Sequence, residues 1–182
     1  MGKYTSFHDI PRFTSWGNYA VDYPLDYLVK WLDEQVSSAG LILNPDFQRG
    51  HVWTQRQQIE YIQFLLKGGR TGRDLHFNCP SWHQPVPEGA YNEFVCVDGL
   101  QRVTAVTRFI RNEIKVFGTY YKDFTDSIRT TTDVLRIHIN DLPTKRQVLN
   151  WYLEMNGAGT PHTRKELRRV AELRDALPPD DT

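Results

Sequence analysis

The residue types best suited to phosphate chemistry lie together in one six-residue turn, Val97-Asp98-Gly99-Leu100-Gln101-Arg102. A short apolar strand precedes this turn and an amphipathic helix follows it, so free backbone N–H groups and the positive end of the helix dipole face the turn. Gly99 lets a phosphate approach the backbone closely. Arg102 adds a planar set of donors that fits phosphate oxygens. Asp98 can cap the helix, bind Mg²⁺ or act as a base.

An ordinary capped helix explains the same turn equally well. In that interpretation Asp98 is the cap and Arg102 lies on a solvated helix face, because a single G-x-x-R match is common. From local chemistry alone, the phosphate site and the plain helix start are two open hypotheses.

A second group of candidate residues lies in the loop before the next predicted helix. Gly50 favours irregular backbone there, and Arg49 beside it is placed to make a second phosphate contact. Gln48 can orient water or a base edge, and a structural hydrogen bond is an equal alternative. The apolar residues of the loop are predicted to anchor it to the core: Phe47, Val52 and Trp53.

A third candidate segment joins the last two predicted helices, from Asn156 to Thr160. Gly157 and Gly159 give it the freedom to close over a bound nucleotide, with Asn156 and Thr160 as polar contacts. A plain turn between helices explains these residues equally well.

The elements that position these segments can be read from hydrophobic periodicity. Helical spacing predicts helices near 24–40, 54–68, 98–112, 144–155 and 163–176, and alternation predicts strands near 75–79, 93–97, 114–117 and 135–139. Residues 1–23 show no clear period and are predicted to form an irregular arm. Residues 24–177 then form one domain and 178–182 a disordered tail. Short strands without a regular βαβ rhythm indicate an α+β fold.

Composition excludes several classes of protein. Lysine plus arginine and aspartate plus glutamate number 22 each, so no bulk positive field drives non-specific binding to nucleic acid or anionic membrane. The two cysteines, Cys79 and Cys96, are too few for a zinc motif or a disulfide framework. No apolar stretch has the length of a signal peptide or a membrane span. We therefore expect a cytoplasmic protein with no membrane partner.

The motifs also resemble known families. Gly99-x-x-Arg102-x-x-Ala105 is similar to the nucleotide-binding helix start shared by ParB-type partition proteins and sulfiredoxins. The loop 47–53 followed by the turn 97–102 resembles the N-terminal domain of GmrSD-type restriction proteins, whose strings read approximately F-Q-R-x-Y-V-W and V-D-G-Q-Q-R. Here Leu100 replaces a glutamine and His51 a tyrosine. The segment 156–161 resembles a later glycine-containing loop of that family.

This resemblance implies a ParB/sulfiredoxin-like small mixed sheet flanked by helices, which binds a nucleoside triphosphate with Mg²⁺. The family motif residues match Asp98, Gln101 and Arg102, and its loop arginine matches Arg49. Asp98 is then expected to bind the metal or activate water, and Gln101 to position the attacking group, while the two arginines hold the phosphates. Sulfiredoxins carry a reactive cysteine at the position of Leu100, so repair of sulfinic acids is not expected here.

Two classes of function follow from these observations. The first is an enzyme that hydrolyses a nucleoside triphosphate or cleaves a phosphodiester in DNA, in restriction or defence or as a phage-type nuclease, with a kinase as a variant. The second is a non-catalytic nucleotide sensor or DNA-associated adaptor that acts with a partner protein. A third possibility is that the motifs are only folding elements. The expected ligands are a nucleotide, Mg²⁺, DNA and a partner chain that supplies a missing C-terminal module.

Overall fold

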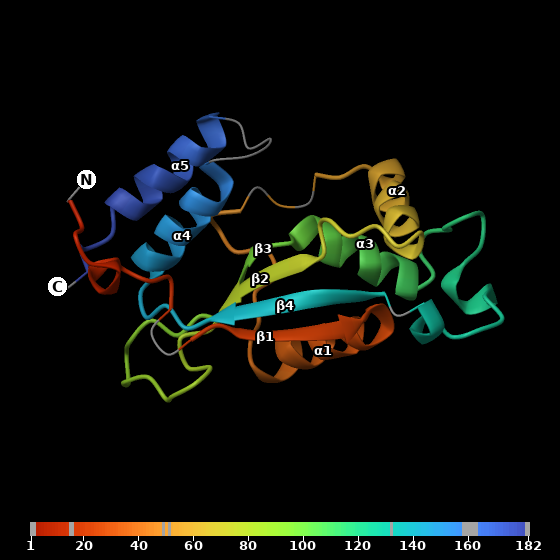
Figure 1. Ribbon diagram of the computed structural model, residues 1–182, viewed down its shortest axis with the longest axis horizontal. Helices are drawn as coiled ribbons and strands as arrows, with labels where there is room; N and C mark the ends of the chain where they lie inside the picture. Colours follow the sequence, from red (N-terminus) through yellow and green to blue (C-terminus); the bar gives the residue numbers. More distant parts are fainter. Residues whose placement is uncertain are drawn as a thin grey trace.

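A four-stranded mixed sheet organises the chain in the computed structural model, which describes residues 3–14, 17–48, 50, 52–131, 133–157 and 164–180. The strand order is β1-β4-β2-β3 (Figure 1). β4 (Val134–Asn140) pairs antiparallel with β1 (Tyr19–Pro24) and parallel with β2 (Asp74–Asn78), and β3 (Val95–Asp98) pairs antiparallel with β2. The predicted α+β fold, with a small mixed sheet flanked by helices, is confirmed.

Three helices cover one face of this sheet (Figure 1). α1 (Leu25–Ser38) and α3 (Leu100–Ile110) pack directly beneath the strands, and α2 (Gln55–Leu66) packs against α3. Alternate strand residues point into this main core because side chains in a strand alternate between faces. They are fully buried: Leu75, Phe77, Cys96, Leu135, Ile137 and Ile139.

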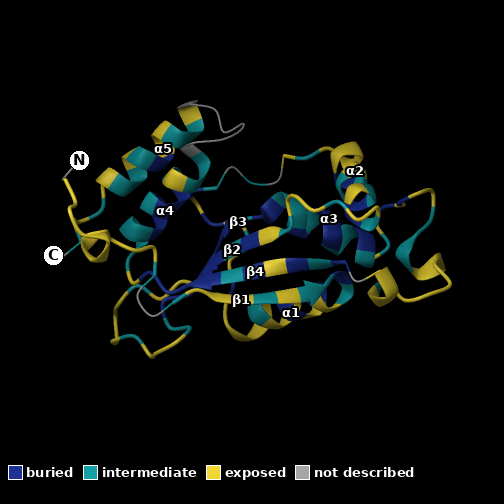
Figure 2. Cartoon of the chain, in the orientation of Figure 1, coloured by how far each residue is buried: buried dark blue, intermediate teal, exposed yellow. Residues whose placement is uncertain are grey.

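The opposite face of the sheet is covered only in part. α4 (Lys145–Gly157) and α5 (Arg164–Asp175) form a second core with Val95 and Val97 of β3. The rest of this face carries polar side chains on the strand positions that alternate with the main core, and exposed segments run along β1, β2 and β4 (Figure 2). We call this surface the open sheet face; its residues are Ala20, Asp22, Asp74, His76, Arg136 and His138.

The helix starts and stops follow local chemistry that the sequence predicts. Thr54 caps α2 in a capping box: its hydroxyl accepts from the N–H of Gln57, and the Gln57 side chain accepts from the N–H of Thr54 at 2.8 Å. α1 ends before Gly40, which has a φ of +68°. Within the described part of the chain, every helix falls short of the length or the apolar character that crossing a bilayer requires.

Two predicted segments differ from the structure. Residues 1–23 are predicted to be irregular, which is wrong for residues 19–23, because they belong to β1 and β4 supplies the backbone partners of this edge strand. A strand at 114–117 is also wrong. Phe117 and Gly118 have φ values of +52° and +79°, so the chain turns back and forms only a bridge between Val116 and Thr119.

The predicted tail 178–182 is described as far as Asp180. That residue follows α5 without regular secondary structure, and its carboxylate accepts a 2.6 Å hydrogen bond from the hydroxyl of Thr144. Asp181 and Thr182 lie outside the described residues. The boundaries of the domain stay a prediction.

Candidate functional site

The predicted turn joins β3 to α3 through a single residue. β3 ends at Asp98, α3 begins at Leu100, and Gly99 between them is the N-cap residue with φ +118° and ψ 0°. A Cβ atom at Gly99 would lie 2.6 Å from Cδ2 of Leu75. Both backbone conformation and packing against β2 therefore require glycine here. The helix start has no side-chain cap, so the interpretation of Asp98 as the cap is wrong.

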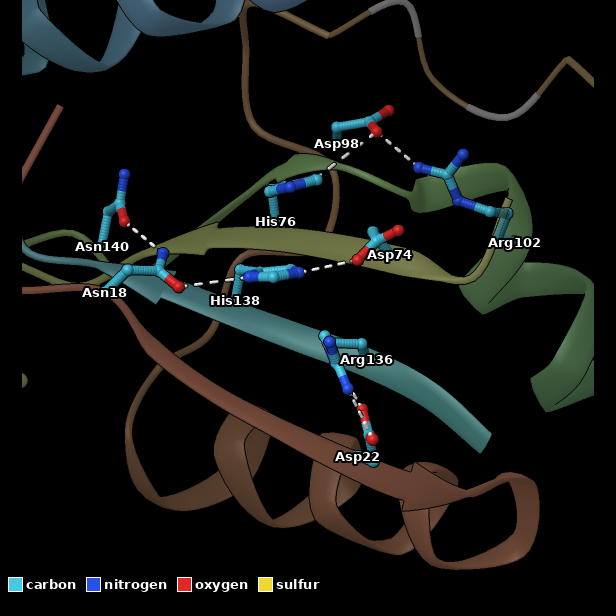
Figure 3. Close-up of polar contacts among 9 residues, drawn as sticks. All are labelled: Asn18, Asp22, Asp74, His76, Asp98, Arg102, Arg136, His138 and Asn140. Atoms are coloured by element: carbon cyan, nitrogen blue, oxygen red, sulfur yellow. Dashed lines mark hydrogen bonds and ion pairs between the residues drawn. The ribbon is translucent and has the colours of Figure 1, made fainter. Parts of the chain in front are cut away.

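Asp98 instead forms an ion pair with the guanidinium group of Arg102, one helical turn away (Figure 3). Nδ1 of His76, on the neighbouring strand, lies 3.8 Å from the same carboxylate oxygen. Burial of Asp98 opposes its ionisation, but its interactions with His76 and Arg102 outweigh this effect and hold the pKa of the carboxyl below its ordinary value. Asp98 is therefore a carboxylate at neutral pH.

Two nitrogen atoms beside Asp98 are buried without a hydrogen-bond partner among the described residues: Nε of Arg102 and Nδ1 of His76. Buried polar atoms in folded proteins are nearly always paired, because an unpaired one costs about 1–3 kcal/mol. Both atoms belong to side chains that are still partly exposed, at 21% for Arg102 and 24% for His76. This turn therefore combines a charged pair with two buried, unpaired nitrogens on side chains that are partly exposed.

The site also contains histidines that the sequence analysis missed. His76 and His138 are register partners on β2 and β4, and their rings stack with centroids 4.8 Å apart and planes 10° apart. The ladder between β2 and β3 is irregular at His76, and the register still places His76 opposite Asp98. Trp151 of α4 contacts the His76 ring edge-on at 5.9 Å. The sequence does contain a signal for these residues. In each of the two strands a histidine stands at a polar position of the alternating polar and apolar pattern.

The two predicted glutamines hold the loop 47–53 against the strand and the helix start. Nε2 of Gln48 donates to the carbonyl of Cys96 at 2.5 Å. Oε1 of Gln101 accepts from the N–H groups of Val52 and Trp53 at 2.9 and 3.0 Å, and its Nε2 donates to the carbonyl of Gly50 at 2.8 Å. A role for Gln101 in positioning an attacking group stays a prediction.

The described structure does not place the other predicted phosphate-binding residues next to Asp98. Arg49, in the loop that Gln101 anchors, and Thr160 lie outside the described residues. Asn156 lies at the end of α4, where its amide donates to the carbonyl of Tyr152 at 2.8 Å. No hydrogen bond between Asn156 and the Asp98–Arg102 pair is present in the described ranges. Nucleotide contacts from these three residues stay predictions.

The cysteines play no visible part in the site. Cys96 points into the main core, and burial raises the pKa of its thiol to about 12. Burial also raises the pKa of Cys79 above its ordinary value. A thiol that remains protonated is a poor nucleophile, so these residues are structural.

A resident magnesium ion does not fit Asp98 in this arrangement. Its carboxylate is already paired with Arg102 and faces His76, and no group of three or more histidine, cysteine, aspartate or glutamate side chains among residues the structure describes could hold a metal ion. Mg²⁺ usually needs carboxylates, waters and phosphate oxygens in octahedral geometry. The side chains present are compatible with magnesium that arrives on the phosphates of a nucleotide.

Comparison with known proteins places this site in a family. A family model described as the N-terminal domain of GmrSD restriction endonuclease matches residues 29–127, which include most of α1 and all of α2, β2, β3 and α3 with Asp98 and Arg102. Neither curated proteins nor solved structures gave a significant match. Because the family match covers more than half of the 182 residues, the chain belongs to the family of GmrSD restriction endonuclease N-terminal domains.

Proposed function

We propose that this domain binds a nucleoside triphosphate at the start of α3 and hydrolyses it as part of a restriction system. The observation that carries the proposal is the buried, unpaired Nε of Arg102 beside the Asp98 carboxylate. A guanidinium group has five N–H donors in a fixed plane, and phosphate oxygens are acceptors of matching geometry. A phosphate bound there gives Arg102 the partner that it lacks.

The helix start supports the same choice of ligand. The first turn of α3 has no side-chain cap, and its dipole favours negative charge. Gln101 holds Gly50, Val52 and Trp53 next to that turn, and we propose Arg49, the residue before Gly50 in the sequence, as a second phosphate contact. Arg102 and the N-terminus of α3 would bind the phosphates. The Asp98 carboxylate would orient the two side chains that face it, Arg102 and His76.

The link to restriction comes from the family to which the chain belongs, and it makes DNA a candidate target of the system. Cleavage of a phosphodiester in DNA uses the same phosphate recognition, so DNA can compete for this site. Magnesium enters with the nucleotide as part of the substrate. A partner chain remains the candidate source of any further chemistry.

The first experiment measures binding of ATP, GTP, CTP and UTP with Mg²⁺ by thermal shift and calorimetry. A nucleotide at a hundredfold excess over its Kd adds about 2.7 kcal/mol to stability, which corresponds to an increase in Tm of roughly 5–10 °C for a domain of this size. Arg102→Lys retains a positive charge beside Asp98 but loses the planar donors, and we expect at least a tenfold weaker affinity.

Arg111→Ala is the matched control, since Arg111 lies at the opposite end of α3 and pairs with exposed Asp33. Its affinity should equal that of the wild type. The absence of stabilisation by all four nucleotides would refute the proposal. Binding with no measurable turnover, together with altered assembly in Asp98→Asn, would instead favour the sensor or adaptor function.

A further inference from the structure

Both ring nitrogens of His138 have hydrogen-bond partners. Its Nε2 lies 2.7 Å from a carboxylate oxygen of Asp74, and its Nδ1 lies 3.1 Å from Oδ1 of Asn18 (Figure 3). A carboxylate can only accept at this contact, so Nε2 donates. Whether Nδ1 also donates depends on whether the Asn18 atom that faces it is its oxygen.

A chain of amides fixes that orientation. Asn140 donates from Nδ2 to the backbone carbonyl of Phe13 at 2.5 Å, and a carbonyl can only accept. Oδ1 of Asn140 therefore faces Asn18 and accepts from its Nδ2 at 2.5 Å. Oδ1 of Asn18 is left to face His138, whose Nδ1 must donate. Both ring nitrogens of His138 thus face acceptors, and the ring is held between Asn18 and Asp74.

His76 stacks on the His138 ring. The charged groups around this stack are the Arg102 guanidinium on α3, the Asp98 carboxylate on β3 and the Asp74 carboxylate that contacts His138. Nδ1 of His76 faces the Asp98 carboxylate at 3.8 Å, which favours a proton on Nδ1 rather than a lone pair. The free lone pair is then on Nε2.

The exposed part of the His76 side chain lies away from Nδ1. Nδ1 is buried, while 24% of the side chain remains exposed, so the exposure belongs to its other atoms. The ring is held on one side by stacking on His138 and at its edge by Trp151. A held imidazole whose Nδ1 faces a carboxylate, on a partly exposed side chain, is suited to accept a proton at Nε2 during catalysis.

We infer that His76 is the general base of this site and that Asp98 is its orienting partner. The inference rests on the proposed hydrolysis of a nucleoside triphosphate. Nε2 of His76 takes a proton from water, and the water oxygen forms a bond to the γ-phosphorus. The bond from that phosphorus to the bridging oxygen breaks, and its electron pair stays on the departing nucleoside diphosphate. The proton on His76 then passes to solvent.

Substitution of His76 by asparagine tests this role with little change in its contacts. The amide of His76→Asn can place an N–H donor near Asp98, as Nδ1 does, but it has no group in place of Nε2. We expect nucleotide affinity to be unchanged and kcat to fall by about 10²–10⁴-fold, the usual contribution of a general base. His8→Gln is the control, because His8 is exposed in the short 3-10 helix Phe7–Asp9, and it should retain full turnover.

Different outcomes separate this inference from the proposed function. Full turnover in His76→Asn, with nucleotide still bound, would overturn the base and leave the proposed function intact. Failure of the wild type to bind any nucleotide would overturn both. An unchanged kcat with a raised KM in His76→Asn would also overturn the base, since it indicates a binding role alone.

Nitrogen-15 NMR of the whole chain at neutral pH tests the protonation states without any ligand. We expect both ring nitrogens of His138 to be protonated, and His76 to carry its proton on Nδ1 alone. A neutral His138, or a His76 protonated only on Nε2, would overturn the arrangement. In Asn18→Leu the partner of Nδ1 is lost, and the signal of a doubly protonated His138 should weaken while that of His8 is unchanged.

Discussion

Gly99→Ala is the substitution whose cost the structure defines most sharply. The new Cβ would lie 2.6 Å from Cδ2 of Leu75 and 3.4 Å from its Cα, at a residue with a φ of +118°. An L-residue with positive φ costs roughly 1–2 kcal/mol, and overpacking of a well-packed core adds about 1–3 kcal/mol. A gain of about 0.4–1 kcal/mol from the stiffer unfolded chain offsets part of this cost. The expected loss is about 2–4 kcal/mol.

Gly40→Ala separates the two contributions. Gly40 also has a positive φ, +68°, but no atom lies within 4 Å of the position of its Cβ, so this variant carries the backbone cost without the contact. Urea unfolding followed by circular dichroism measures both variants. We expect Gly99→Ala to lose about 1–3 kcal/mol more than Gly40→Ala, since that is the range for overpacking.

Leu75→Val completes the test, because valine lacks the δ carbon that the new Cβ would strike. In that background Gly99→Ala should cost less than in the wild type, with a coupling energy of about 0.5–3 kcal/mol as is usual for residues in contact. Equal losses for Gly99→Ala and Gly40→Ala, or a coupling energy of zero, would refute the packing argument. Glycine would then be required here by its backbone conformation alone.

Two further predictions concern charged groups. Arg73 is mostly buried and donates to Asp133 at 2.7 Å and to three backbone carbonyls, so Arg73→Ala should lower the free energy of unfolding by about 3–5 kcal/mol. Arg136→Ala breaks an exposed pair and should change the free energy of unfolding little. Equal losses for Arg73→Ala and Arg136→Ala in urea unfolding would contradict this reasoning. The pKa of Asp98 is lower in the folded state than its ordinary value of 3.8, so its stabilisation is present above that pH and is lost as pH falls through the folded pKa. Acid titration of stability should therefore be shallower in Asp98→Asn, and a curve identical to the wild type would contradict the shift.

The elements that the sequence predicted correctly are those defined by local pattern. α1, α2 and α3 follow from apolar residues at helical spacing between recognisable caps, and β4 from the alternation of Leu135, Ile137 and Ile139. β1 was missed because its backbone partners lie about 115 residues further along the chain, and no local pattern reports them. The resemblance to the GmrSD N-terminal domain, based on three segments, is confirmed by the family match, which covers the first two of them, 47–53 and 97–102.

The sequence predicts the part of the candidate site whose residues are close together in the chain. Asp98 and Arg102 are four residues apart at a helix start, so the sequence itself brings their side chains together. His76 and His138 meet only through the register of two strands that are far apart in sequence. Gln101 was predicted to position an attacking group, and Gln48 to orient water or a base edge or, equally, to make a structural hydrogen bond, because polar side chains in a motif look alike in sequence. Their partners are backbone groups, which no residue pattern reveals.

The pairing of β1 with β4 has a consequence for biosynthesis. Tyr19 cannot meet Ile139 until the ribosome has added about 120 more residues, which takes roughly 6–24 s at typical rates of translation. Closing such a long loop is slow compared with forming helices. The contacts of Asn18 and Phe13 with β4 form at the same late step. The nascent domain therefore acquires its completed histidine pair only after nearly the whole chain has emerged.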